Sequence, residues 1–201
     1  MKRILQLAML AALVGGAPLA AQQSRPGLAV AEEPAMRKGF FFQFGMGGGE
    51  ERLDLDNDFL GYSDPIWALT LNLRGGFALN PYMRLGADFN TWIRPEGAFT
   101  ETASSIMPNL QLYPFRNLGL HVRGGGGYAW SSLSENDFYY SSITYGGFGT
   151  NLGAGWDIPV SRKVALTPTF DWYQYWIDNN QVGGYTERIL SIGLAVSFQT
   201  R

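Results

Sequence analysis

Eight segments of the 201-residue chain alternate apolar and polar side chains with a period of two. Residues 82–93, YMRLGADFNTWI, place Leu85 and Phe89 in one set and Arg84 and Asp88 in the other. Successive side chains of a β-strand point to opposite faces, so this pattern predicts strands with one apolar and one polar face. No segment with a helical period separates them. The expected strands are residues 39–49, 67–80, 82–93, 104–113, 118–131, 145–158, 163–177 and 188–198.

The apolar face of these strands is predicted to contact lipid. Trp, Phe, Leu and Ile occupy it on nearly every strand, whereas Gly, Ala, Ser, Thr and Asn dominate the other face. An eight-stranded barrel has an interior only just wide enough for side chains, so the bulky set cannot point inward as in a soluble lipocalin-like barrel. A soluble monomer rarely exposes so large an apolar surface. We therefore predict an all-β fold, an eight-stranded antiparallel up-and-down transmembrane β-barrel, whose closure satisfies every backbone group.

The connections between the strands are expected to alternate in length. Short connections rich in turn residues fall near residues 80–81, 114–117 and 159–162. Longer polar connections fall near residues 50–65, 95–103, 132–144 and 178–187. Pro108 and Pro168 interrupt two of the strands. Because proline cannot donate to a ladder, we expect local bulges at both positions.

The beginning of the chain predicts export. Residues 1–21 contain a basic start, an apolar run and a small-residue region, the three parts of a secretory signal. Residues 22–38 contain two prolines and no period, so they are expected to form a flexible lead before a barrel domain at residues 39–201. A net charge of -2 argues against nucleic acid as a partner. The chain has no cysteine, which excludes disulfides and thiolate chemistry.

Together these features resemble the small outer-membrane β-barrel proteins of Gram-negative bacteria, of the OmpA-barrel, OmpX and OmpW type. The resemblance covers residues 39–198 and rests on the signal, the strand count, the alternating connections and the final LSIGLAVSF. That family ends on an aromatic residue recognised during assembly, whereas Phe198 is followed here by three more residues. The resemblance implies a porin-like monomer in the cell outer membrane with periplasmic termini. Its implied partners are outer-membrane lipid, lipopolysaccharide and the assembly machinery.

Charged residues also fall on the inward face of the predicted strands. Arg74 and Asp88 lie at comparable distances from the turn at 80–81, so we predict that they pair. A salt-bridge network is favoured over an ion-selective path, because charges in a closed interior must be neutralised. The single histidine, His121, lies close to a short turn and is interpreted as a lumen residue. The predicted lumen charge network is Arg74, Arg84, Asp88, Arg123, Asp157 and Asp171, accompanied by Arg94, His121 and Tyr173.

The long connections carry the remaining candidates. Asp54, Asp56 and Asp58 have the spacing of the first ligands of a calcium loop. The sixth and twelfth positions of that loop are Phe and Pro instead of Gly and Glu, so a solvated acidic loop is favoured, with weak divalent-cation binding as the minor alternative. The aromatic residues 138–140 could form an adhesive or receptor surface, contact lipopolysaccharide or simply extend the strands, and the sequence does not choose between these. We predict no catalytic residue, no cofactor and no metal site.

The predicted function is a structural role in envelope integrity or a role in surface contacts, without enzymatic activity. A second hypothesis is a narrow channel for small or hydrophobic solutes, which the OmpW resemblance suggests. A third and less favoured hypothesis is a lipid A-modifying enzyme that depends on His121. Conductance measurements separate the first two, since a filled barrel should be silent.

Overall fold

The computed structural model describes residues 39–55, 64–115, 117–135, 142–178 and 184–200. Every regular element in these ranges is a β-strand, and they contain no helix that could cross a membrane. The predicted signal and lead, residues 1–38, fall outside them. The elements are β1 (Gly39–Leu55), β2 (Ile66–Asn80), β3 (Met83–Glu96), β4 (Phe99–Leu112), β5 (Leu120–Glu135), β6 (Ser142–Trp156), β7 (Ile158–Pro159), β8 (Val164–Ile177) and β9 (Tyr185–Gln199).

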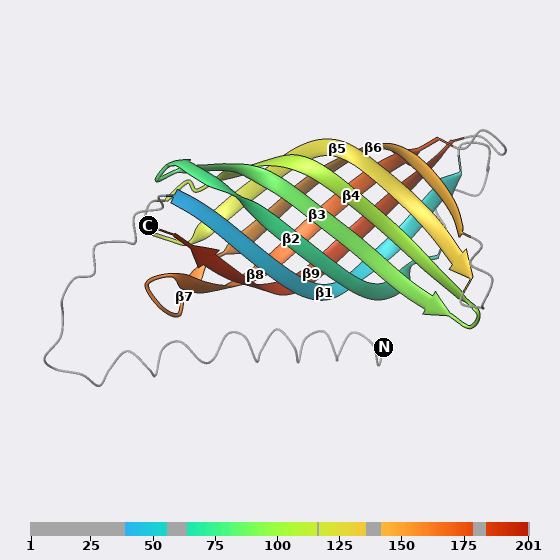
Figure 1. The fold of residues 1–201 in the computed structure, drawn as a ribbon, viewed down its shortest axis with the longest axis horizontal. Coiled ribbons are helices and arrows are strands. Elements are labelled where there is room, and N and C mark those ends of the chain that lie inside the picture. Colours follow the sequence, from blue (N-terminus) through green and yellow to red (C-terminus); the bar gives the residue numbers. More distant parts are fainter. Residues whose placement is uncertain (1–38, 56–63, 116, 136–141, 179–183, 201) are drawn as a thin grey trace, which may run out of the picture. The chain divides into compact units, whose positions relative to one another are not determined.

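The strands form one closed antiparallel barrel (Figure 1). Each long strand pairs with the long strands before and after it in the chain, and β1 pairs with β9 to close the wall. The two-residue β7 continues the line of β6, because both pair with β8 in the same register. The wall therefore has eight strand positions, which confirms the predicted fold class.

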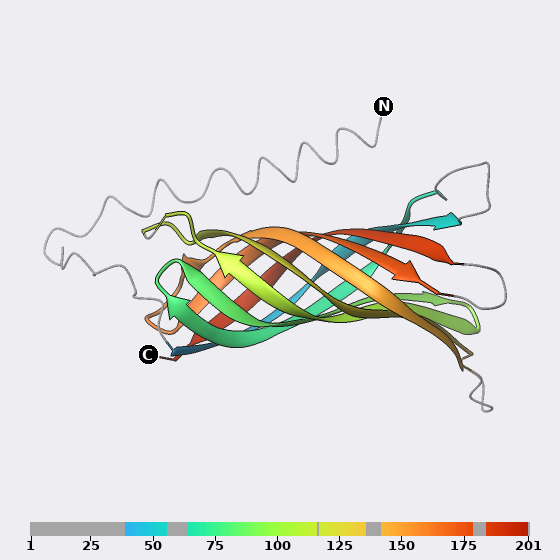
Figure 2. The ribbon, with the colours of Figure 1, turned by 90° about the horizontal axis from the view of Figure 1, so that it is seen from above.

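One circuit around the wall shows how far the strands are staggered. The circuit starts at Trp176 on β8 and moves at each step to the directly paired residue of the next strand. It passes only through apolar, outward-facing residues and returns to β8 at Leu166, ten positions earlier. A stagger of this kind requires strands tilted by about 35–45° from the barrel axis. Figure 2 shows the resulting crossing of the front and back walls. The intervening pairs join Phe148, Tyr128, Ile106, Phe89, Leu73, Phe44 and Val196.

The outer face of the barrel is an apolar band. Its large side chains are about half exposed, for example 46% for Phe44 and 58% for Ile192. Exposed aromatic residues occur toward both ends of the strands, as expected where a barrel meets the two interfaces of a bilayer. They include Trp67, Tyr128 and Trp176 toward one end and Tyr82, Phe115, Trp156 and Phe198 toward the other. The outward orientation of the apolar set therefore agrees with the prediction.

The two ends of the barrel differ in their connections. We call the half that contains the start of β1 and the end of β9 the terminal half, and the opposite half the loop half. At the loop end, the long connection predicted for residues 95–103 is wrong, because only Gly97 and Ala98 separate β3 from β4. Gly97 has a φ of 60°, a conformation that favours glycine in tight turns. Polar residues continue both strands up to this turn, and Arg94 lies 3.6 Å from Glu101 across the ladder.

Both strand prolines lie in ladders of constant register, so the bulges predicted there are absent. Pro108 stands opposite Ala87 and Pro168 opposite Leu194 without a shift. Each proline interrupts pairing with its other neighbouring strand, and the register resumes unchanged beyond the gap. A missing donor is therefore accommodated by losing local pairing instead of by inserting a residue. A register shift does occur between β2 and β3, at residues 78–80.

Candidate functional site in the barrel interior

Arg74 on β2 makes two ion pairs inside the terminal half. Its Nε donates to Oδ2 of Asp88 at 2.9 Å, and its Nη2 donates to Oδ2 of Asp171 at 3.0 Å. Asp88 stands directly opposite Arg74 in the register of β2 and β3. Opposed residues of an antiparallel pair share a face, so a hairpin alone brings this pair together. Asp171, in contrast, comes from β8.

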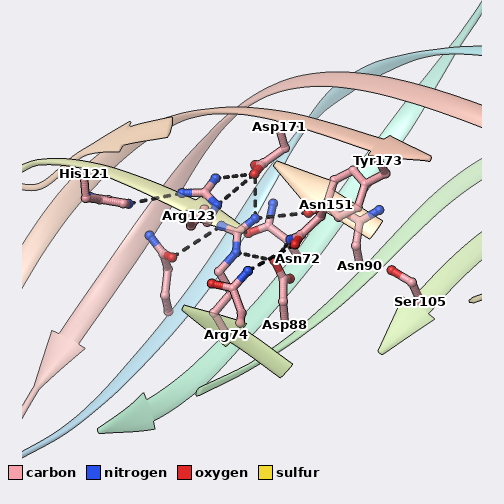
Figure 3. Close-up of polar contacts among 12 residues, drawn as sticks. Asn72, Arg74, Asp88, Asn90, Ser105, His121, Arg123, Asn151, Asp171 and Tyr173 are labelled. Carbon is pink, nitrogen blue, oxygen red and sulfur yellow. Dashed lines mark hydrogen bonds and ion pairs between the residues drawn. The ribbon is translucent and has the colours of Figure 1, made fainter. Parts of the chain in front are cut away.

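Arg123 on β5 reaches Asp171 from another direction (Figure 3). Its Nε donates to Oδ1 of Asp171 at 2.8 Å, and its Nη2 contacts the same oxygen. We call Arg74, Asp88, Arg123 and Asp171 the central cluster. Each of its side chains is at most 2% exposed, and two positive charges face two negative ones. Buried charges are tolerated when they are paired and hydrogen-bonded in this way.

Amide and hydroxyl groups complete the central cluster. They add residues from β1 and β6, and through Asn151 one from β4, to the charges contributed by β2, β3, β5 and β8. The network therefore crosses the interior and links seven strands. Gln43, Asn72 and Tyr173 bond to Arg74, Asn151 donates to Asp88 at 3.0 Å, and Asn109 donates to Asn151.

Gly153 on β6 makes room for the pair of Arg123 and Asp171. It lies between the two in the ladder, paired with Arg123 on one side and with Asp171 on the other. A Cβ at this position would collide with Oδ1 of Asp171 and lie 3.0 Å from Nε of Arg123. The two side chains can meet across β6 because this residue has no side chain of its own.

A second charged group lies closer to the terminal end. Arg84 Nη1 is 3.4 Å from Oδ2 of Asp157, and Arg84 Nη2 donates to Oε1 of Gln199 at 2.7 Å. Asp157 also accepts hydrogen bonds from Tyr113 at 2.9 Å and from Thr167 at 2.8 Å. The six predicted lumen residues thus divide into the central cluster and this pair.

His121 stands between the two charged groups. Its Nε2 lies 3.1 Å from Nη1 of Arg123, and its Nδ1 lies 3.3 Å from the carbonyl oxygen of Gly119 and 3.8 Å from Asp157. Arginine can only donate, so Nε2 accepts and the proton of a neutral ring resides on Nδ1. The side chain is 1% exposed and faces the interior, away from lipid.

The interior of the loop half contains a large apolar cluster, contrary to the prediction of a polar lumen along the whole barrel. Trp92, Met107, Tyr175, Ile177 and Ile189 are all at most 1% exposed and pack into one cluster. The indole Nε1 of Trp92 donates to the carbonyl oxygen of Gly49 at 3.0 Å. Long apolar side chains therefore fill this half by packing, and we call them the apolar core.

A family model described as an outer membrane protein beta-barrel domain matches residues 8–198. The match covers nearly the whole chain and agrees with the closed, lipid-facing barrel. The chain belongs to this family. As an outer membrane β-barrel protein, it carries its apolar band in the lipid of an outer membrane.

Solved structures of outer-membrane barrels share the fold. The chain is similar to Neisserial surface protein A at 16% identity and a TM-score of 0.56, with 81% of this chain and 97% of that chain covered. It is also similar to Ail, the attachment invasion locus protein of Yersinia pestis, in complex with the heparin analogue sucrose octasulfate. That comparison gives 11% identity and a TM-score of 0.50, with 80% of this chain and 99% of that chain covered. At these identities the likeness shows the fold alone, and no curated protein matches the chain.

Two glutamates inside this outer membrane barrel were missed by the sequence reasoning. Glu51 on β1 and Glu187 on β9 are 1% and 0% exposed and border the apolar core. Both fall on inward positions of the strand alternation once β1 and β9 are extended toward the loop end. The signal was therefore present, but the segments were assigned to long connections.

The acidic first connection offers no metal site among the described residues. No group of three or more His, Asp or Glu side chains in the described ranges is arranged to hold a metal ion. Asp54 belongs to β1, whereas Asp56, Asp58 and the aromatic residues 138–140 lie outside the described residues.

Proposed function

We propose that this outer membrane β-barrel protein is a non-conducting barrel with a structural role in the envelope and in contacts at the cell surface. The central cluster carries this proposal. Its four charged side chains are at most 2% exposed and are joined by hydrogen bonds from seven strands. An eight-stranded barrel has little interior to spare. A cross-section filled in this way leaves no continuous path for water or ions.

The composition of the outer face supports lipid and lipopolysaccharide as the partners of such a barrel. A broad apolar band with exposed aromatic residues toward both ends suits the acyl chains and headgroup regions of outer-membrane lipid, including lipopolysaccharide. The predicted export signal supports delivery to the outer-membrane assembly machinery. We infer a monomer with the terminal end toward the periplasm and the loop end toward the outside, the orientation that the family resemblance implies.

The same interior weighs against the two other hypotheses. A narrow channel for small solutes would have to pass both the central cluster and the apolar core. A lipid A-modifying enzyme would need His121 at the lipid surface, but that side chain faces inward and contacts Arg123 and the Gly119 carbonyl.

Single-channel recording in planar bilayers tests the proposal. Folding of the purified protein is first verified by heat-dependent mobility on gels. We expect no stepwise conductance, because the side chains of the central cluster block the lumen. Arg74→Gly with Asp88→Gly opens only the terminal half and should stay silent, because the apolar core still closes the lumen. Adding Trp92→Gly should create small conductance steps, whereas Arg162→Gly in an exposed turn should stay silent. Discrete conductance steps from the folded, unmodified protein would refute a non-conducting barrel.

A further inference from the structure

Glu51 and Glu187 form a buried carboxyl pair at the seam that closes the barrel. The register places Glu51 opposite Ile189 and Glu187 opposite Leu53, so the two carboxyls are diagonal neighbours on the inner face of β1 and β9. All four of their oxygens are buried and accept no hydrogen bond from an N–H or O–H donor of the described residues, and the two carboxyls lie within hydrogen-bonding reach of each other. We call these two residues the glutamate pair. Polar atoms buried in a native structure are seldom left without a donor, so this arrangement needs an explanation.

Among the described residues, no cation is paired with the glutamate pair. No lysine, arginine or histidine in the described ranges forms an ion pair with either carboxyl. The titratable groups that face the pair are Glu101 from β4, Tyr175 from β8 and Tyr185 from β9. Glu101 adds a further negative charge and is itself 3.6 Å from Arg94. The Tyr175 hydroxyl donates to Ser105 instead of to the pair.

We propose that the glutamate pair holds one proton, shared between its two carboxyls at neutral pH, and that this proton fastens the loop end of the β1–β9 seam. Two ionised carboxylates in a dry site would repel each other and remain unsolvated. One shared proton removes one charge and supplies the donor that the buried oxygens lack.

The glutamate pair lies where the pairing of β1 changes from two neighbouring strands to one. Pairing of β1 with β2 ends at Glu51 and Ile66, whereas pairing with β9 continues to Leu55 and Tyr185. Beyond the pair, β1 therefore has one described partner strand instead of two. Loss of the proton places two like charges beside this single ladder. The ladder between the end of β1 and the start of β9 then opens.

The direction of the pH effect follows from the number of bound protons. The closed seam holds one proton, and the opened seam, whose carboxyls are solvated, releases it above the usual glutamate range of about pH 4. When the closed state binds more protons than the opened state, the closed state becomes less stable as pH rises. The fastening is therefore complete at acidic pH and weakens toward alkaline pH, by up to about tenfold in the opening equilibrium per pH unit.

Hydrogen exchange of the folded protein in lipid nanodiscs tests this inference. We expect the amides of residues 52–55 and 185–188 to exchange faster with rising pH after correction for intrinsic rates, by up to about tenfold per unit. Residues 41–44 at the terminal end of β1 should show no such dependence. Glu51→Gln supplies a permanent donor without a charge and should abolish the effect. Glu50→Gln, on the neighbouring outward position beside Arg52, should retain it.

Two results would overturn the inference. One is an equal pH dependence in the wild type and in Glu51→Gln. The other is protection that follows added calcium and its chelation instead of pH, which would assign the pair to a metal ion. Infrared spectroscopy gives a readout that does not depend on the variant folding. The wild type at neutral pH should show the carbonyl stretch of a protonated carboxyl, and its absence would also exclude a shared proton.

Discussion

The terminal half and the loop half of this barrel are filled by different chemistry inside one continuous wall. The terminal half contains the central cluster and the pair of Arg84 and Asp157, joined by hydrogen bonds across the lumen. The loop half contains the apolar core. Arg74 and Trp92 are nevertheless equally buried, at 1% and 0% exposed. Most of this dry interior is thus filled either by paired charges or by close packing of apolar groups.

The two solutions are expected to fail in different ways. Removing one member of an ion-pair network leaves its partners charged, buried and unpaired. Removing an apolar side chain leaves a cavity, whose cost depends on how far the neighbours relax. Substitutions in the two halves therefore test whether the contrast in composition is also a contrast in energetics.

The largest effect is expected from Arg74→Ala in the terminal half. This change leaves Asp88 and Asp171 facing each other without the guanidinium that now bonds to both. We expect the free energy of unfolding to fall by about 3–5 kcal/mol, the usual cost of breaking a buried ion pair. Urea unfolding from lipid vesicles, followed by tryptophan fluorescence, measures it.

The matched control for this change is Arg162→Ala, in the exposed turn before β8. It should alter the free energy of unfolding by no more than about 0.5 kcal/mol. An Arg74→Ala loss as small as that of the control would mean that the terminal half is solvated and that the contrast between the halves is wrong.

A smaller effect is expected from Ile189→Ala in the apolar core. Ile189 is fully buried, whereas Ile192 on the same strand is 58% exposed on the lipid-facing surface. Both changes lose the transfer free energy of the deleted groups, about 0.8 kcal/mol per CH₂. Only the inner change leaves a cavity that lipid cannot fill, so Ile189→Ala should cost about 3 kcal/mol in all, which is about 1 kcal/mol more than Ile192→Ala. Equal losses in the same urea assay would show that the apolar core is loosely packed.

The sequence predicted those features that depend on alternation and on local pairing. The outward position of residues such as Leu85 and Phe89 follows from the period of two. Arg74 and Asp88 could be matched because a short turn at 80–81 sets their register within one hairpin. The fold class followed from the same pattern, since alternation over eight strands allows few other solutions.

The features that were missed depend on strands distant in the sequence or on interrupted alternation. In β8 the run YQYWI at residues 173–177 is bulky on both faces, so its inward set could not be recognised as an apolar core. Polar residues next to the turn at Gly97 hid the ends of β3 and β4, because strands beyond the lipid band need no apolar face. The bond between Arg123 and Asp171 crosses an intervening strand, and its sequence signal is the glycine at position 153 that leaves space for it.

The smallest of the three effects tests that glycine directly. A methyl group at position 153 would displace Asp171 from Arg123 and lie 3.0 Å from the carbonyl oxygen of Phe170. Overpacking of this kind costs about 1–3 kcal/mol, which Gly153→Ala should show in the same urea assay. Gly124→Ala is the matched control, because its Cβ would point outward and meet atoms no closer than 3.5 Å. That change should leave stability unchanged or raise it by up to about 1 kcal/mol, since alanine restricts the unfolded chain. Equal effects of the two substitutions would mean that the central cluster does not depend on the space left by Gly153, and that the pairing of Arg123 with Asp171 adds little to the stability of the terminal half.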